Sequence, residues 1–155
     1  MQPPHPSHPE IRTTPLTLTI RGHSLKHNPA KSYGEEIISL LNRVWPILKS
    51  ANIPNDGLNR VIYEKDGTVF AGIVFNPDAD TNPAAAALEQ KHLHLTRYAY
   101  WKHTGPYHLI PTTCAAMTKS LEAQGIHQSW PMLEVYGHWT NDESKLETET
   151  FVAIT

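Results

Sequence analysis

The order of secondary-structure signals repeats along this chain, and that repeat limits the folds it can adopt. Residues 16–20, LTLTI, alternate as a strand does, and residues 33–53 show helical spacing of apolar side chains. Residues 60–75 then predict a hairpin, with an Asp-Gly pair at its turn. A second strand, a helix over 109–124 and a second hairpin follow in the same order. The sequence therefore predicts two halves, each built as strand, helix, strand, strand.

Short sequence matches support this repeat. The segments LKHN and WKHT, which contain His27 and His103, each end the first strand of a half. FAGI at 70–73 matches FVAI at 151–154 in the second hairpin. The recurrence of the two histidines predicts a packing or turn role at the strand end.

The spacing within the halves gives an alignment of one half with the other. In each half, ten residues separate the isoleucine after the helix from a hairpin tyrosine, which is Tyr63 or Tyr136. This alignment pairs the two tyrosines. It also aligns Val61 of the first half with Glu134 of the second. We therefore expect the predicted cleft to hold a single acid at this aligned position.

One βαββ half has an antiparallel sheet with a helix on one face, and it is too small to bury its apolar surface alone. We therefore expect an α+β fold: a tandem βαββ repeat with pseudo-twofold symmetry, an antiparallel sheet with helices on one face, and a central ligand cleft. A disordered or extended tail over 1–15 should precede a single domain over 16–155. Its halves are 16–75 and 92–155, and residues 76–91 link them.

The first helix has a clear apolar stripe. Ile37, Leu41, Val44 and Leu48 recur at helical spacing and should be buried. Pro46 falls inside this run and should kink the helix or end its regular part. The second helix should end at a glycine, which is a common C-terminal cap.

Composition excludes several classes of protein. Lys and Arg number 13 against 15 Asp and Glu, which gives a net charge of −2 and no basic face for nucleic acid. No stretch approaches the ~20 apolar residues of a membrane helix. The start, MQPPHPSHPE, has no apolar run and is not a secretory signal. Cys114 is the only cysteine, so no internal disulfide forms, and we expect a cytoplasmic protein.

The stretch SWPMLEVYGHW, 129–139, places one carboxylate among aromatic residues. Residues two apart in a strand point the same way, so Glu134 and Tyr136 should share a face. A buried carboxylate is costly, and a cation would offset that cost by ion pairing and by resting on ring faces. The alternatives are that Glu134 points to solvent, or pairs with Arg60 or Arg97. The surrounding aromatics can equally be core residues, and Tyr33 and Trp45 are assigned to the core.

Three motifs resemble the GyrI-like small-molecule-binding family, whose domain is also the effector-binding part of AraC- and MerR-type regulators. They are YAYWKHTGPY, PMLEVY and TETFVAI, and the resemblance covers about residues 16–155. Its most specific pieces are Gly105-Pro106-Tyr107 and the Glu134-Val-Tyr136 spacing. The resemblance implies that Glu134 lies in a cleft and meets cationic or polar aromatic ligands.

We expect a stand-alone protein that binds a cationic or amphipathic aromatic molecule, either to sequester a drug or toxin or to sense it. No cofactor is implied, and a regulator or gyrase is a possible protein partner. The predicted ligand-contact residues are Glu134, Tyr136, Trp130, Trp101, Tyr63, Tyr107 and His103. One alternative is a hydrolase of reactive electrophilic molecules, with Glu134 as general base and Tyr136 or Tyr107 polarising the substrate. A second is a gyrase-modulating interaction module.

Metal and thiol chemistry have weaker signals. His92 and His94 share a strand face, but no third ligand stands at a recognised spacing, so we expect no metal site and two exposed histidines. His5 and His8 lie in the tail. Cys114 lies in a helix beside small residues and is expected to be a small buried side chain rather than a nucleophile.

We predict no sequence-specific binding to duplex DNA, because the chain has neither a basic stripe nor a recognition helix. An electrophoretic mobility-shift titration at low salt checks this. Tight, sequence-dependent retardation would contradict it.

Overall fold

The computed structural model describes residues 8–155, and contacts divide them into two compact units. The first unit is Leu16–His94. The second unit contains Leu95–Thr155 together with the segment that ends at Pro15. His5 lies outside the described residues.

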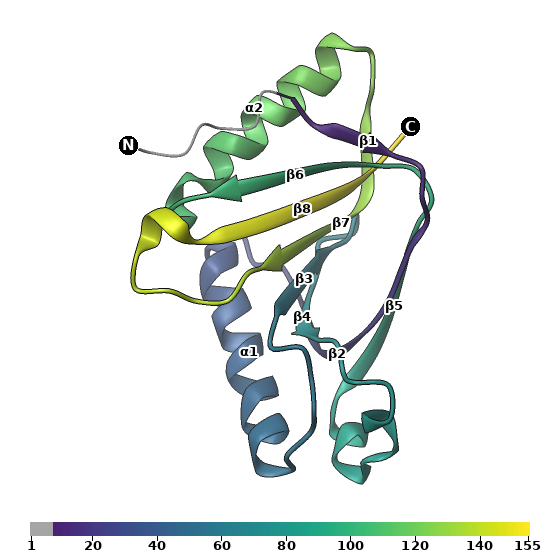
Figure 1. Cartoon of the computed structure of the whole chain (residues 1–155), viewed down its shortest axis with the longest axis vertical. Helices are drawn as coiled ribbons and strands as arrows, with labels where there is room; N and C mark the ends of the chain where they lie inside the picture. Colours follow the sequence, from purple (N-terminus) through teal and green to yellow (C-terminus); the bar gives the residue numbers. More distant parts are fainter. Residues whose placement is uncertain (1–7) are drawn as a thin grey trace. The chain divides into compact units, whose positions relative to one another are not determined.

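The first unit contains four neighbouring β-strands and one α-helix. Its elements are β2 (Leu16–Lys26), α1 (Tyr33–Ser50), β3 (Asn59–Tyr63), β4 (Thr68–Ile73), the short helices η1 (Ala79–Thr81) and η2 (Pro83–Ala87), and β5 (Glu89–Leu95). The strand order is β3-β4-β2-β5, and β4 runs antiparallel to both β2 and β3 (Figure 1). The helix α1 packs on β2 and β4.

The second unit has the same order of elements. They are β1 (Glu10–Arg12), β6 (Tyr98–Thr104), η3 (Tyr107–Leu109), α2 (Ile110–Ala123), β7 (Gln128–Tyr136), η4 (Glu143–Lys145) and β8 (Glu147–Ile154). The strand order is β1-β6-β8-β7, with antiparallel pairing throughout. Each unit therefore places the third strand of its βαββ plan between the first and the second. The α+β class with antiparallel strands and two α-helices is confirmed, and the tandem repeat, its pseudo-twofold axis and the central cleft stay predictions.

Two strands lie where the sequence did not indicate them. Residues 10–12, inside the expected tail, form β1 on the outer side of β6. Residues 89–91, inside the expected linker, begin β5, which lies next to β2. Both segments are too short or too polar to show a clear strand pattern, and pairing with a neighbouring strand decides their conformation.

The strand ladders correct the alignment of the two halves. Phe70 lies opposite Ile62 in β3, and Phe151 of the matching FVAI lies opposite Leu133 in β7. If the two phenylalanines are equivalent, Tyr63 rather than Val61 takes the place of Glu134. On that alignment, the equal ten-residue spacing from Ile53 to Tyr63 and from Ile126 to Tyr136 does not mark equivalent residues. The connections from α1 to β3 and from α2 to β7 then differ in the number of residues that precede strand pairing.

Local signals explain where the helices begin and end. Ser32 caps α1 by accepting a hydrogen bond from the Glu35 N–H at 3.1 Å. Pro46 does not end the helix, which continues to Ser50; it lies on the exposed side, where water can reach the carbonyl group that lacks an N–H partner. Gly125, with φ of 73°, follows α2 as expected for a C-terminal cap.

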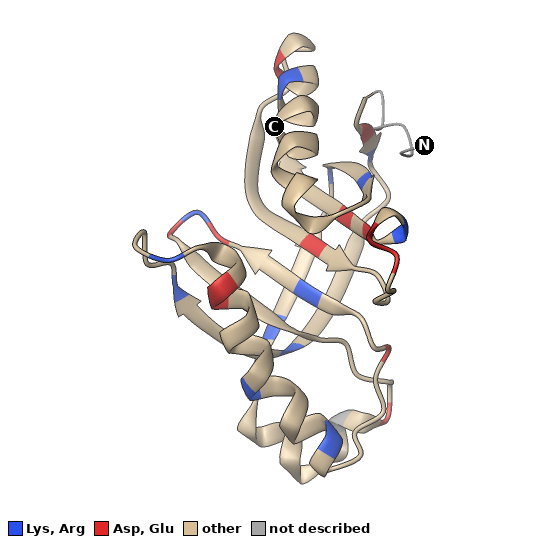
Figure 2. Cartoon of the chain, turned by 90° about the vertical axis from the view of Figure 1, so that its left-hand side faces the viewer, with Lys and Arg blue, Asp and Glu red and all other residues tan. Residues whose placement is uncertain are grey.

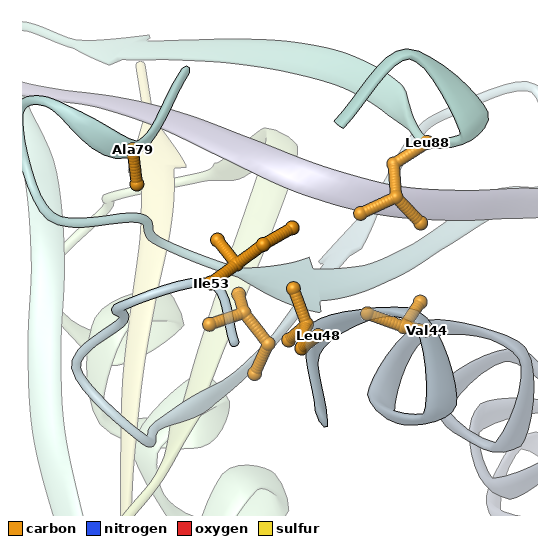
Figure 3. Close-up of a cluster of buried hydrophobic side chains, with 6 residues drawn as sticks. Val44, Leu48, Ile53, Ala79 and Leu88 are labelled. Atoms are coloured by element: carbon orange, nitrogen blue, oxygen red, sulfur yellow. The ribbon is translucent and has the colours of Figure 1, made fainter. Parts of the chain in front are cut away.

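The core of the first unit forms around the apolar stripe of α1. Val44 and Leu48 pack with Ile53 after the helix and with Ala79 and Leu88 (Figure 3). Ile37 is buried as predicted, but Leu40 is more deeply buried than the predicted Leu41, which is half-buried. The expectation that Tyr33 belongs to the core is wrong: its side chain is 45% exposed.

In each unit, a histidine at the end of a strand contacts a polar side chain of the helix that follows. His27 Nδ1 lies 2.5 Å from Glu36 Oε1 of α1, and the N–H of Asn28 donates to Glu36 Oε2. His103 Nδ1 lies 2.7 Å from Thr113 Oγ1 of α2. Both bonds tie the end of a strand to the start of the following helix, which confirms the predicted packing role.

The bonds from His27 and Asn28 lower the pKa of Glu36, since they favour its charged form. A carboxylate whose pKa is lowered by folding stabilises the fold at neutral pH, and this contribution is lost as the pH falls through the folded-state value. Glu36 is therefore a structural acid.

Among residues 8–155, charged residues of both signs are distributed along the helices, strands and loops. In Figure 2, Lys and Arg segments are interspersed with Asp and Glu segments, and no helix or strand is basic along its length. Within residues 8–155, no helix combines the length and apolar character needed to cross a membrane.

We predict that Gly22→Ala destabilises the protein by about 3 kcal/mol or more, because an added Cβ would stand 2.0 Å from the Ala71 carbonyl oxygen across the ladder. Gly67→Ala is the matched control. It adds a Cβ with nothing within 4 Å, so only the positive φ of 91° costs free energy, about 1–2 kcal/mol. Chemical denaturation measures both, and equal losses would refute the close approach.

Candidate functional site

Three neighbouring strands of the second unit place polar groups in one row. Trp101 of β6 lies opposite Thr150 of β8, which in turn lies opposite Glu134 of β7. Side chains that face each other across a ladder point to the same side of the sheet. Trp101 packs with Met117 and Leu121 of α2, so this is the side that α2 covers.

The Glu134 carboxylate is buried on this side. Its residue is 5% exposed, and the Tyr136 hydroxyl donates a hydrogen bond to Glu134 Oε1 at 3.3 Å. Removing a carboxylate from water costs several kcal/mol unless polar partners or a counter-charge replace the water. The alternative in which Glu134 points to solvent is therefore wrong.

Two tyrosine rings meet beside this carboxylate. Tyr107 of η3 and Tyr136 of β7 contact edge to face, with ring centroids 5.5 Å apart. Tyr107 is 39% exposed, and burial raises the pKa of its hydroxyl, so that group stays neutral at physiological pH. The Tyr107 and Tyr136 rings are thus aromatic neighbours of Glu134, and Tyr107 is partly exposed. Such rings can make cation–π contacts or contacts with another aromatic ring.

Cys114 of α2 borders the same row, and sequence reasoning did not place it there. Its thiol is half-buried and packs against the cluster that contains Trp101. Burial raises the pKa of Cys114, and the charge of Glu134 raises it further, while Trp101 and Thr150 act in the opposite direction. The thiol therefore stays protonated at neutral pH, which argues against a nucleophile.

Two buried polar atoms on this side lack a hydrogen-bond partner among residues 8–155. They are Trp101 Nε1 and Thr148 Oγ1, in residues that are 2% and 0% exposed. The Cys114 sulfur lies near the indole, but a thiol is a weak acceptor. Most buried polar groups are satisfied, so these two atoms are exceptions on the helix-facing side of the sheet.

His103 has a structural role. It is 1% exposed, with Nδ1 near Thr113 and Nε2 3.0 Å from the Pro106 carbonyl oxygen. A carbonyl oxygen only accepts, so Nε2 carries the hydrogen, and in the neutral ring Nδ1 accepts from the Thr113 hydroxyl. Both nitrogens hold the start of α2 to β6, which favours the packing role over ligand contact.

The remaining predicted contact residues lie elsewhere. Trp130 is 48% exposed in the irregular start of β7, between Gln128 and Met132. Tyr63 belongs to the first unit, where its ring meets Tyr33 edge to face at 5.4 Å. The second unit thus brings together Glu134, Tyr136, Tyr107 and Trp101, and the roles of Tyr63 and Trp130 stay predictions.

Alternation in the last strand is the signal that sequence reasoning missed. Thr148 and Thr150 are two residues apart in TETFVAI, so they share a face with Val152. Buried threonines at alternate positions, followed by an apolar residue on the same face, indicate a polar end to an otherwise apolar layer. For metals, no group of three or more His, Cys, Asp or Glu side chains in the described part of the chain is arranged to hold an ion.

Comparison with known proteins shows the fold. No protein-family profile matches the sequence, and no curated protein matches it. Among solved structures, the EcmrR C-terminal domain is 13% identical with a TM-score of 0.69, covering 95% of this chain and 98% of that one. SAV2435 bound to tetraphenylphosphonium is 18% identical with a TM-score of 0.56, covering 95% and 93%. A hydrolase from Listeria innocua is 16% identical with a TM-score of 0.58, covering 96% and 92%. The chain therefore shares the fold of the EcmrR C-terminal domain and of a drug-bound protein.

We predict that Glu134→Gln lowers the pKa of Cys114 without bringing it to the value of a free thiol, because burial is the larger cause of its elevation. The pH–rate profile of alkylation by neutral iodoacetamide measures this, and Cys114 is the only cysteine in the chain. Glu149→Gln is the control: it makes the same charge change in β8, where Glu149 accepts a hydrogen bond from Tyr100. An equal shift in both variants would show that Glu134 has no local effect on the thiol.

Proposed function

We propose that this chain is a GyrI-like binding protein for small aromatic cations, with Glu134 as the charged group of its site. The observation that carries the proposal is the burial of Glu134 beside the Tyr136 hydroxyl and the Tyr107–Tyr136 ring pair. Sequestration of a toxic compound and ligand sensing are the two roles that such binding serves.

The free energy of the site favours a cationic guest. Glu134 is buried, so a positive charge placed beside it would be attracted more strongly than in water. The same cation would gain contact with a ring face of Tyr107 or Tyr136. Aromatic groups on the ligand add edge or face contacts with Tyr107 and Tyr136.

The structural relatives support this choice of ligand class. Tetraphenylphosphonium, which is bound in one relative, is a cation enclosed by four phenyl rings. Its chemistry fits a carboxylate with aromatic neighbours. Contacts of the ligand with Tyr63 and Trp130 are part of the proposal, as is the expectation that the chain needs no cofactor.

A hydrolase is the second candidate, because one relative of this fold is described as a hydrolase. In that function Glu134 would take a proton from water as general base, and a tyrosine hydroxyl would polarise the electrophile. The Tyr136 bond to Glu134 would then position the base. Partnership with gyrase or a regulator stays a separate prediction.

We predict that Glu134→Gln weakens tetraphenylphosphonium binding by about 1–3 kcal/mol, the scale of a charge-assisted contact in a sheltered site. Binding of neutral triphenylphosphine oxide should change little. Isothermal titration calorimetry measures both ligands. Glu149→Gln is again the matched control, since it changes the net charge equally and should leave both affinities unaltered.

The same variant separates the binder from the hydrolase. A hydrolase would keep its affinity for an aryl ester and lose about 10²–10⁴-fold in turnover when Glu134 becomes Gln. A binder shows no turnover to lose. If Glu134→Gln changes neither affinity nor turnover, the carboxylate has no role in either function.

A further inference from the structure

The exposed side of β5 carries two histidines held in the same way. His92 Nδ1 lies 2.9 Å from Thr19 Oγ1, and His94 Nδ1 lies 2.8 Å from Thr17 Oγ1. Both threonines belong to the neighbouring strand β2. The two rings are therefore anchored through the same nitrogen, on one face of one strand.

The hydrogen bonds of His92 indicate which of its ring nitrogens carries the lone pair that could bind a metal ion. Gln90 Nε2 lies 3.2 Å from His92 Nε2. An amide nitrogen only donates, so His92 Nε2 accepts and carries no hydrogen. In the neutral ring Nδ1 then carries the hydrogen and donates to the Thr19 hydroxyl. With the same tautomer, His94 would donate from Nδ1 to Thr17 and keep a lone pair on its own Nε2 for a metal ion.

We propose that His92 and His94 form a bidentate site for a divalent transition-metal ion of the zinc, copper or nickel type. Imidazole suits these ions, and a metal-bound histidine typically donates its other ring N–H to a fixed acceptor. Thr17 and Thr19 supply that acceptor for each ring. The threonines therefore act as positioning residues for the two ligands.

The strand geometry permits chelation with a modest movement of the rings. Residues two apart on a strand are about 6.5–7 Å apart. Two nitrogens bound at about 2.0–2.1 Å to one tetrahedral ion are about 3–3.5 Å apart, so the rings must lean toward each other. Both side chains are exposed, which leaves room for this movement. The Gln90 amide must release His92 Nε2 when the metal binds.

Two protein ligands leave positions on the ion open. Because no group of three metal-binding side chains occurs in the described part of the chain, water or a ligand from another molecule completes the coordination. Such an open site has modest affinity and exchanges its remaining ligands readily. It lies in the first unit and is independent of the function proposed for Glu134.

Zn²⁺ titration by calorimetry tests the site, in a background in which His5 and His8 are both replaced by Gln. We expect one equivalent of Zn²⁺, with saturable binding lost in His92→Asn and equally in His94→Asn. Thr17→Val and Thr19→Val keep the histidines and remove the acceptors, and each should weaken binding by about 10–100-fold. His108→Asn, at another exposed histidine, is the control and should bind as the background does.

Imidazole nitrogen chemical shifts give a readout that does not depend on affinity. In the metal-free protein they should report the hydrogen on Nδ1 of both rings, and Zn²⁺ should shift both Nε2 signals together. Zn²⁺ binding that survives replacement of either histidine would overturn the proposal, because the two rings then do not act as one chelate. Unchanged affinity in both threonine variants would remove their positioning role.

Discussion

The register of the β6–β8–β7 ladder determines which side chains of the second unit can meet. It places Trp101, Thr150 and Glu134 in one row and turns that row toward α2. A shift of a single residue in β7 would move Glu134 to the opposite face. Leu133 and Val135, which are both buried, would then take its place on the helix side. Leu133 and Val135 share the face opposite Glu134, and their burial on that face therefore helps to fix the register that turns the carboxylate toward α2.

The two units use the same plan for different chemistry. Each has a histidine that fastens the end of a strand to the start of a helix, but one partner is Glu36 and the other is Thr113. Glu36 is buried and its carboxylate is hydrogen-bonded to His27 and to the N–H of Asn28, so it serves the fold. Glu134 lies in a different setting, buried beside Tyr136 on the side of the sheet that α2 covers.

Histidines in this chain also separate by role according to their surroundings. His103 uses both ring nitrogens inside the second unit, and it is almost completely buried. His92 and His94 are exposed, and each is bonded through Nδ1 to a threonine of β2, while Nε2 of His92 also meets the Gln90 amide. His103 therefore has a structural role, because a buried ring whose two nitrogens are both bonded cannot reach a metal ion. His92 and His94 are candidate metal ligands because their rings are exposed.

The sequence by itself determined the order of elements, since periodicity and turn residues are local properties. It located both α-helices, the Asp66-Gly67 hairpin turn and the acid among aromatics. Only the tertiary structure decided that Glu134 lies in one row with Thr150 and Trp101, that β1 pairs with β6, and that Cys114 borders this row. Register and helix-to-sheet packing join residues far apart in the chain, and short strands such as β1 gain their stability from that pairing rather than from their own residues.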